Sequence, residues 1–182
     1  MRRGRRRGER AGVWRAILKD ASRWLLLDVG NSAVKWRLAA PTQLSSQGGR
    51  AENLEMLRSM LDGLDWQHVA VASVAGDQLD ADLAEIVTEG KPVKVRYATS
   101  ESELLGLRNG YQTPQTLGVD RWLAITGLLE ASLAANPAHR VVVTGGGAAD
   151  LLTLKPKIEH QPDLVAEGLR LWLALQLDDR PS

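Results

Sequence analysis

The sequence contains no cysteine and no phenylalanine among its 182 residues, and only three histidines. Without cysteine it has no disulfide scaffold, zinc–thiolate site, iron–sulfur cluster or cysteine nucleophile. His68, His139 and His160 are too scattered to match the spacing of metal ligands. No apolar run approaches the ~20 residues that cross a bilayer. These absences, with 44% hydrophobic and 25% charged residues, predict a globular protein that is not embedded in a membrane.

The formal charge of +1 averages two unlike parts of the chain. Residues 1–24 carry nine basic and two acidic side chains, whereas residues 25–182 carry fourteen basic and twenty acidic ones. The opening MRRGRRRGER has almost no apolar side chain, so we predict that residues 1–23 form a disordered basic leader. Such an arm could bind nucleic acid or an anionic membrane surface, or be a solvated extension. No basic stripe recurs after residue 37, which argues against nucleic acid as a partner.

Strand and helix patterns alternate along the body, which predicts an α/β fold with an antiparallel start. The apolar run before Asp28 and the alternating residues after the Gly30-Asn31 turn predict a β-hairpin over residues 24–39. Further strands are predicted over residues 42–47, 68–74, 93–97 and 141–144. Helices are predicted over residues 52–61, 77–88, a short stretch capped by residues 100–103, 119–135 and 164–177. Asp77 is the predicted N-cap of the second of these helices.

The predicted hairpin turn carries residues that suit phosphate chemistry. Asp28 stands at the end of a buried strand, directly before a turn that contains Gly30, Asn31 and Ser32. Backbone N–H groups and the Ser32 hydroxyl can face a phosphate, and the carboxylate can hold a hydrated Mg²⁺. The alternative is an ordinary hairpin turn in which the aspartate caps its own backbone.

A second polar pair opens the long predicted helix, and a glycine run follows the last predicted strand. Asp120 suits the positive end of a helix dipole, but Arg121 does not, which predicts another partner for the arginine. The carboxylate could accept a proton from an alcohol, and the guanidinium could clamp an anion. The alternative is an N-cap aspartate beside a surface arginine. The run that contains Gly145 and Gly146 could admit a ligand to the backbone or serve only as a turn.

Four segments, taken in order, resemble the type III pantothenate kinase family of bacterial coenzyme A biosynthesis, in the acetate kinase, sugar kinase, Hsp70 and actin-like superfamily. They are DVGNSAVKW (28–36), NGYQTPQTLGVDRW (109–122), VTGGGA (143–148) and PDLVAEGL (162–169). The second segment, with its Tyr-x-x-Pro-x-x-Leu-Gly-x-Asp-Arg spacing, is the specific one. The resemblance implies an α/β fold with a complete ribonuclease H-like, actin-like ATPase lobe over residues 24–108 and a truncated second lobe over residues 109–182.

The resemblance also implies what the matching residues do. Asp120 would be the general base that deprotonates the pantothenate hydroxyl, and Arg121 would stabilise the same pocket. The nucleotide and phosphate site would comprise Asp28, Gly30, Asn31, Ser32, Lys35, Gly145 and Gly146. The substrate site would comprise Tyr111, Gly118, Val119, Asp120 and Arg121. The implied protein is a cytoplasmic homodimer that phosphorylates pantothenate with ATP, uses Mg²⁺ held through water by Asp28, and requires NH₄⁺ or K⁺.

One segment of the family pattern is missing from the sequence. In the family, an Asp-x-Gly-Thr-Ala-x-Thr strand follows the long helix and supplies the monovalent-cation aspartate and a second phosphate loop. No Gly-Thr-Ala-x-Thr occurs here, and Pro137 is followed almost at once by the strand at Val141, which predicts an internal deletion. Removing one charge-stabilising group from an active site costs about 10²–10³ in rate. The sequence therefore predicts a kinase of impaired activity or, alternatively, an inactive remnant or regulatory accessory protein of the same fold.

Overall fold

The computed structural model describes residues 23–134, 142–143 and 159–178. Its centre is a five-stranded sheet in the order β3-β2-β1-β4-β5. The strands are β1 (Trp24–Val29), β2 (Val34–Ala40), β3 (Gln43–Ala51), β4 (His68–Ser73) and β5 (Val95–Tyr97). The first three strands are antiparallel neighbours, whereas β4 and β5 run parallel to β1. The predicted hairpin and the mixed α/β class are confirmed, while the predicted leader lies outside the described residues except for Arg23.

The burial of each strand follows from its place in the sheet. The central strand β1 is apolar on both faces as far as Asp28: Leu25 and Leu27 on one face have no exposed surface, and Trp24 and Leu26 on the other are buried. In β2 the apolar residues Val34 and Trp36 alternate with the partly exposed Lys35. This alternation puts the apolar and charged side chains of β2 on opposite faces of the sheet.

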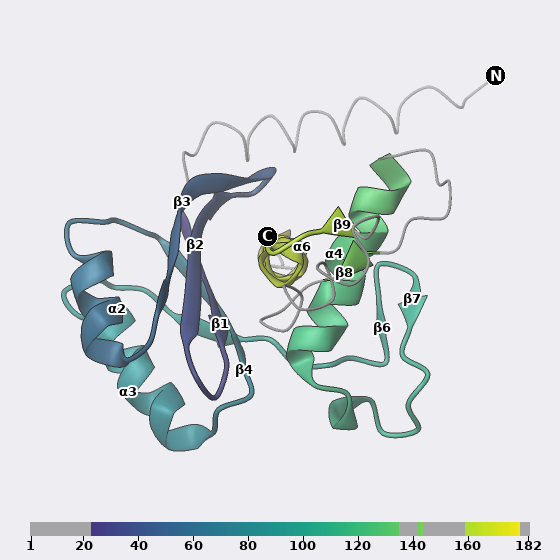
Figure 1. Cartoon of the computed structure of the whole chain (residues 1–182), viewed down its shortest axis with the longest axis horizontal. Helices are drawn as coiled ribbons and strands as arrows, with labels where there is room; N and C mark the ends of the chain where they lie inside the picture. Colours follow the sequence, from purple (N-terminus) through teal and green to yellow (C-terminus); the bar gives the residue numbers. More distant parts are fainter. Residues whose placement is uncertain (1–22, 135–141, 144–158, 179–182) are drawn as a thin grey trace.

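In the described part of the chain, four helices cover the two faces of the sheet. They are α2 (Leu54–Leu61), α3 (Asp77–Thr88), α4 (Val119–Ala134) and α6 (Leu164–Asp178). Figure 1 shows the sheet nearly edge-on, with α2 and α3 on one side and α6, then α4, on the other. The result is a three-layer arrangement in which two separate apolar clusters fill the spaces above and below the sheet.

The starts of α2 and α3 differ in how they are capped. Asn53 caps α2, since its side-chain oxygen accepts the N–H of Met56 at 2.8 Å. The prediction of Asp77 as the N-cap of α3 is wrong: Gly76 occupies that position at φ 104°, without a side-chain cap. A positive φ is open to glycine but strained for other residues. Asp77 lies instead in the first turn, where its charge suits the helix dipole.

A small hairpin replaces the short helix predicted after Ser100. It consists of β6 (Glu103–Leu104) and β7 (Leu107–Arg108), which pair antiparallel. Leu105 and Gly106, between them, both have positive φ, at 52° and 82°. Two left-handed residues are the geometry of a tight hairpin turn, and the glycine supplies one of them readily. The 3₁₀ turn η1 (Pro114–Thr116) then leads into α4.

The helices α4 and α6 cross at two glycines. A Cβ on Gly168 would lie 1.9 Å from the backbone oxygen of Leu123, and one on Gly127 would lie 2.4 Å from that of Leu164. The two backbones can approach this closely because neither position carries a side chain. The crossing seats both helices on the sheet through Trp122, Leu123 and Leu173, which are buried in one cluster with Leu26 of β1.

Two further short strands, β8 (Val142–Val143) and β9 (Glu159–His160), pair parallel to each other. They fall within the segment predicted as a truncated second lobe, and the division into lobes at residue 108 stays a prediction. The predicted deletion between Pro137 and Val141 lies outside the described residues. Within the described ranges, no helix has the length and apolar character needed to cross a membrane.

Candidate functional site

The turn between β1 and β2 is tight and open on its outer side. The N–H of Gly30 donates to the carbonyl of Ala33 at 3.0 Å, which closes the turn. Asn31 and Ser32, between them, are exposed. Both alternatives drawn from the sequence, a phosphate-facing loop and a simple hairpin turn, share this local geometry.

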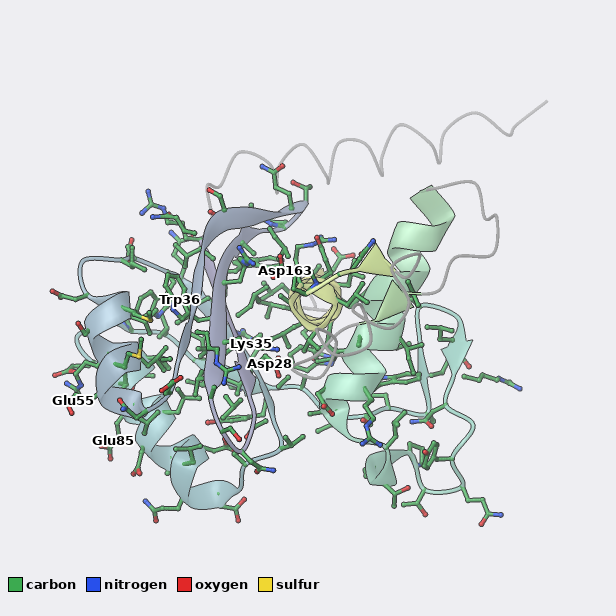
Figure 2. All side chains as sticks on the ribbon, in the orientation of Figure 1. Asp28, Lys35, Trp36, Glu55, Glu85 and Asp163 are labelled. Atoms are coloured by element: carbon green, nitrogen blue, oxygen red, sulfur yellow. The ribbon has the colours of Figure 1, made fainter. Side chains whose placement is uncertain are left out.

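Asp28 enters the site from the second-last position of β1. It is opposite Lys35 in the β1–β2 register, and the Lys35 Nζ lies 3.5 Å from Asp28 Oδ2. Figure 2 shows both side chains on the side of the hairpin that faces α6, whereas Trp36 lies on the side of α2. The side chain of Asp28 is 20% exposed and that of Lys35 is 41% exposed, so the pair borders solvent.

The surroundings of Asp28 perturb its protonation. Burial raises the pKa of the Asp28 carboxyl above its ordinary value, and the charge of Asp120 raises it further. The Lys35 ammonium and its hydrogen bond act in the opposite direction but do not cancel the rise in the pKa. The contribution of Asp120 shows that two carboxylates 92 positions apart in sequence lie within electrostatic reach of each other.

Asp120 is held at the start of α4 by a glycine. The carbonyl of Gly118 accepts the N–H of Trp122 at 3.1 Å, so the first helical hydrogen bond begins there. A Cβ on Gly118 would lie only 2.6 Å from Oδ1 of Asp120. Any side chain at position 118 would therefore displace the carboxylate from its place over the start of the helix. Within the described part of the chain, Arg121 is exposed and has no ion-pair partner, so the partner predicted for it is not found there.

A cavity of about 400 Å³ joins the hairpin turn to the start of α4. Its walls come from β1, the β1–β2 turn, β2, β3, α4 and α6. The lining residues are Asp28, Gly30, Asn31, Ser32, Ala33, Lys35, Arg50, Asp120, Arg121, Ala124 and Val165. Two motifs recognised separately in the sequence thus meet around one space.

A second cavity, of about 420 Å³, lies between the sheet and the start of α6. It shares Asp28, Lys35, Arg50 and Val165 with the first cavity. Its remaining wall includes Arg37 of β2, whose guanidinium pairs with Asp163 immediately before α6. Figure 2 shows Asp163 beside α6 on the same side of the hairpin as Asp28 and Lys35. The two cavities are therefore neighbours along one face of the sheet.

Other residues predicted for the site are not brought together in this way. Tyr111 is 51% exposed in the loop before α4, where its N–H donates to the Asn109 side chain at 3.1 Å, and it is not among the residues lining the first cavity. Val119 is buried in the apolar cluster under α4. Gly145 and Gly146 lie outside the described residues.

Arg50 is the charged cavity residue that the sequence analysis missed. The third strand was predicted to end at residue 47, which left Arg50 in a loop, but β3 extends to Ala51. This extension places Arg50 opposite Lys35 in the β2–β3 register. A strand prediction that ran through the glycines at 48 and 49 would have found it.

The carboxylates of the site fit a Mg²⁺ ion bound together with a nucleotide. No group of three or more His, Cys, Asp or Glu side chains suited to a metal occurs in the ranges that the structure describes. Mg²⁺ in phosphate-transfer sites, however, uses one or two carboxylates and completes its ligands with phosphates and water. Asp28 and Asp120 share one cavity; burial is the main cause of the raised pKa of Asp28 and the charge of Asp120 adds to it, so a divalent cation between them would offset both.

Comparison with known proteins gives the relationship of the chain. A family model for type III pantothenate kinase matches residues 24–177. The type III pantothenate kinase of Pseudomonas aeruginosa strain LESB58 is 38% identical over 150 residues, which cover 81% of this chain and 59% of that protein. Those of Azoarcus sp. strain BH72 and Acidovorax ebreus strain TPSY are 35% and 33% identical. Those alignments cover 81% and 69% of this chain and 56% and 51% of the relatives.

The match to the type III pantothenate kinase family agrees with the fold and with the length of the chain. The five-stranded mixed sheet agrees with the actin-like ATPase fold that the sequence predicted for this family. The chain spans 59% of the length of the Pseudomonas relative, which agrees with the predicted shortening of the second lobe. The match covers 154 consecutive residues, including both motifs that line the cavity. The chain therefore belongs to the type III pantothenate kinase family.

Proposed function

We propose that this chain binds ATP and pantothenate and transfers the γ-phosphoryl group to the pantothenate hydroxyl. The observation that carries the proposal is the single cavity in which the turn after Asp28 faces Asp120 and Arg121. Membership of the family supports the choice of substrates, since the relatives are named type III pantothenate kinases. The cavity walls contain the carboxylates, cations and turn N–H groups that phosphoryl transfer uses.

Each residue of the cavity has a separate role in the proposed phosphoryl transfer. Asp120 accepts the proton of the pantothenate hydroxyl as its oxygen bonds to the γ-phosphorus, and the bond from that phosphorus to the bridging oxygen of ADP breaks. Arg121 neutralises charge on the transferring group, and the turn at Gly30 to Ser32 positions the phosphates. Tyr111, Gly118 and Val119 belong to the proposed substrate side of the site. Gly145 and Gly146 belong to its proposed nucleotide side.

The proposal includes a metal and an assembly. Mg²⁺ held by Asp28 would neutralise phosphate charge. A monovalent cation, NH₄⁺ or K⁺, and a cytoplasmic homodimer complete the proposed enzyme, as the family resemblance implies. The monovalent cation has no assigned ligand, since the family's Asp-x-Gly-Thr-Ala-x-Thr pattern does not occur in the sequence.

A second candidate function is a catalytically inactive remnant or a regulatory accessory protein of the same fold. The observation that favours it is that the family's Asp-x-Gly-Thr-Ala-x-Thr pattern does not occur in the sequence. A protein of this kind would keep the apolar clusters and the cavity but would not catalyse phosphoryl transfer. Thermal shift separates a binder from a protein that has lost its ligands, because a ligand that binds only the folded state raises the melting temperature.

The deciding experiment is a coupled assay of ADP release with ATP, Mg²⁺, K⁺ and pantothenate. We expect pantothenate-dependent turnover that falls about 10²–10⁴-fold in Asp120→Asn, the usual range for loss of a general base. Asp82→Asn is the matched control, since Asp82 is exposed on α3 across the sheet from the cavity. Turnover no higher than that of Asp120→Asn would reject the kinase. A melting temperature raised by ATP·Mg²⁺ or pantothenate without turnover would favour the regulatory alternative, and no shift with either ligand the remnant.

A further inference from the structure

Three cations stand on the cavity face of the β2–β3 pair. Lys35 and Arg37 are two positions apart on β2 and therefore project from the same face. Arg50 of β3 is opposite Lys35 in the register. All three line the second cavity, and Lys35 and Arg50 line the first as well.

Two of these three cations already have a carboxylate partner. Lys35 lies 3.5 Å from Asp28, and Arg37 pairs with Asp163. Within the described part of the chain, no carboxylate pairs with Arg50, and its side chain is exposed. Arg50 thus brings an uncompensated positive charge to the boundary between the cavities.

The strand around Arg50 packs closely against β2. The two residues before it are Gly48 and Gly49. A Cβ on Gly48 would lie 2.7 Å from the Trp36 carbonyl oxygen and 2.9 Å from Cδ of Arg37, and one on Gly49 would lie 3.0 Å from the Trp36 indole nitrogen. The two glycines therefore permit the close approach of β3 to β2, which keeps Arg50 on the walls of both cavities.

We propose that Arg50 binds the terminal phosphates of the nucleotide and adds to the charge neutralisation supplied by Arg121. Asp28 and Asp120 on the same walls repel an incoming polyphosphate, and the charge of Lys35 is already engaged by Asp28. Arg50 on β3 and Arg121 on α4 are the cations of this cavity without a described carboxylate partner. A guanidinium binds phosphate bidentately, which a lysine cannot do. This inference rests on the proposed function, because it takes the cavity as the nucleotide site.

The test is calorimetric binding of ATP·Mg²⁺, AMP and pantothenate to the full chain and to variants at this position. We expect Arg50→Gln to weaken ATP·Mg²⁺ about tenfold or more, as loss of a charge-assisted hydrogen bond does. The affinities for AMP and pantothenate should change less than twofold. Arg50→Lys should fall between the wild type and Arg50→Gln, because it restores the charge without the planar fork.

The matched control is Arg58→Gln on α2, which removes the same charge from an exposed ion pair on the opposite face of the sheet. Its ATP·Mg²⁺ affinity should stay within twofold of the wild type. Circular dichroism checks folding, and Arg50→Lys carries the test if Arg50→Gln does not fold. The role of Arg50 is overturned if Arg50→Gln binds ATP·Mg²⁺ as tightly as the wild type does, or if its affinity falls for pantothenate alone. Either result leaves the kinase proposal standing. A wild-type chain that binds neither ATP·Mg²⁺ nor pantothenate overturns both.

Discussion

The two faces of the central sheet are built from the same strands but differ in chemistry. On the side of α2 and α3, the residues of β1 and β2 are apolar from end to end. These are Leu25, Leu27, Val29, Val34, Trp36 and Leu38, none of them more than 8% exposed. On the side of α4 and α6, the series starts apolar at Trp24 and Leu26 and then changes to Asp28 on β1 and to Lys35 and Arg37 on β2.

The difference shows where the fold can accommodate a site. Asp28 lies between Leu27 and Val29, which have no exposed surface, yet its own side chain reaches a cavity because successive residues of a strand point to opposite faces. The face of α2 and α3 therefore supplies stability, and the face of α4 and α6 supplies both stability and chemistry. Changes on the first face should alter folding and leave ligand binding intact in the molecules that fold.

The largest expected effect on stability comes from the wholly apolar face. Leu25→Ala should lower the free energy of unfolding by about 2–5 kcal/mol, because a fully buried leucine is replaced by a cavity. Chemical denaturation measures the loss. Met56→Ala is the control, since Met56 is 40% exposed on α2 and should cost far less. A loss no larger than that of the control would show that this face is loosely packed and would remove the contrast between the faces.

The next effect comes from the glycine crossing that closes the other face. Gly168→Ala should cost about 1–3 kcal/mol of unfolding free energy, because its Cβ would meet the Leu123 backbone, which cannot rotate away. Gly110→Ala is the matched control, because a Cβ there meets nothing within 4 Å. Equal stability of the two variants would mean that α4 and α6 can separate without loss, and that the site face depends little on their contact.

The sequence predicted the first half of the fold well, because the signals there are local. Alternation in β2, the Gly-Asn turn and the helical spacing over residues 77–88 each depend on neighbours in the chain, and they predict β1, β2 and α3 closely. The short helix predicted after Ser100 was wrong because the residues that decide it are Leu105 and Gly106. Their left-handed turn pairs β6 with β7, and a leucine gives no warning of a positive φ.

The site was predictable as two motifs but not as one cavity. Asp28 and Asp120 each stood out by residue type and position, and the resemblance to the family implied that Asp28 holds Mg²⁺ beside the phosphates and that Asp120 deprotonates the pantothenate hydroxyl. Arg50 gave no comparable signal, because its place depends on how far β3 extends and on its register with β2. Register is set by pairing across strands, and a polar strand that contains two glycines specifies it weakly from sequence.

The smallest expected effect on stability comes from Asp28→Asn. Whereas the variants above lower the free energy of unfolding, this one should raise it relative to the wild type as pH rises. Because burial raises the pKa of Asp28 in the folded state, the folded protein binds this proton more tightly than the unfolded chain does. The contribution of Asp28 to stability is therefore fully present below pH 3.8, the ordinary pKa of an aspartate. It is lost as pH rises from there through the raised pKa of the folded state. Asp28→Asn removes this dependence.

The comparison of Asp28→Asn with the wild type over pH 3 to 8 is thus a test of the site face itself. The difference in unfolding free energy should move in favour of the variant as pH rises and then level off above the folded-state pKa, while ATP·Mg²⁺ binding is weakened. Asp65→Asn, at an exposed position before β4, is the control for loss of a carboxylate outside the cavity. A variant that loses stability relative to the wild type as pH rises would mean that the pairing with Lys35 outweighs burial. The carboxylate would then stabilise the fold, and the separation of stability from chemistry at this strand would be lost.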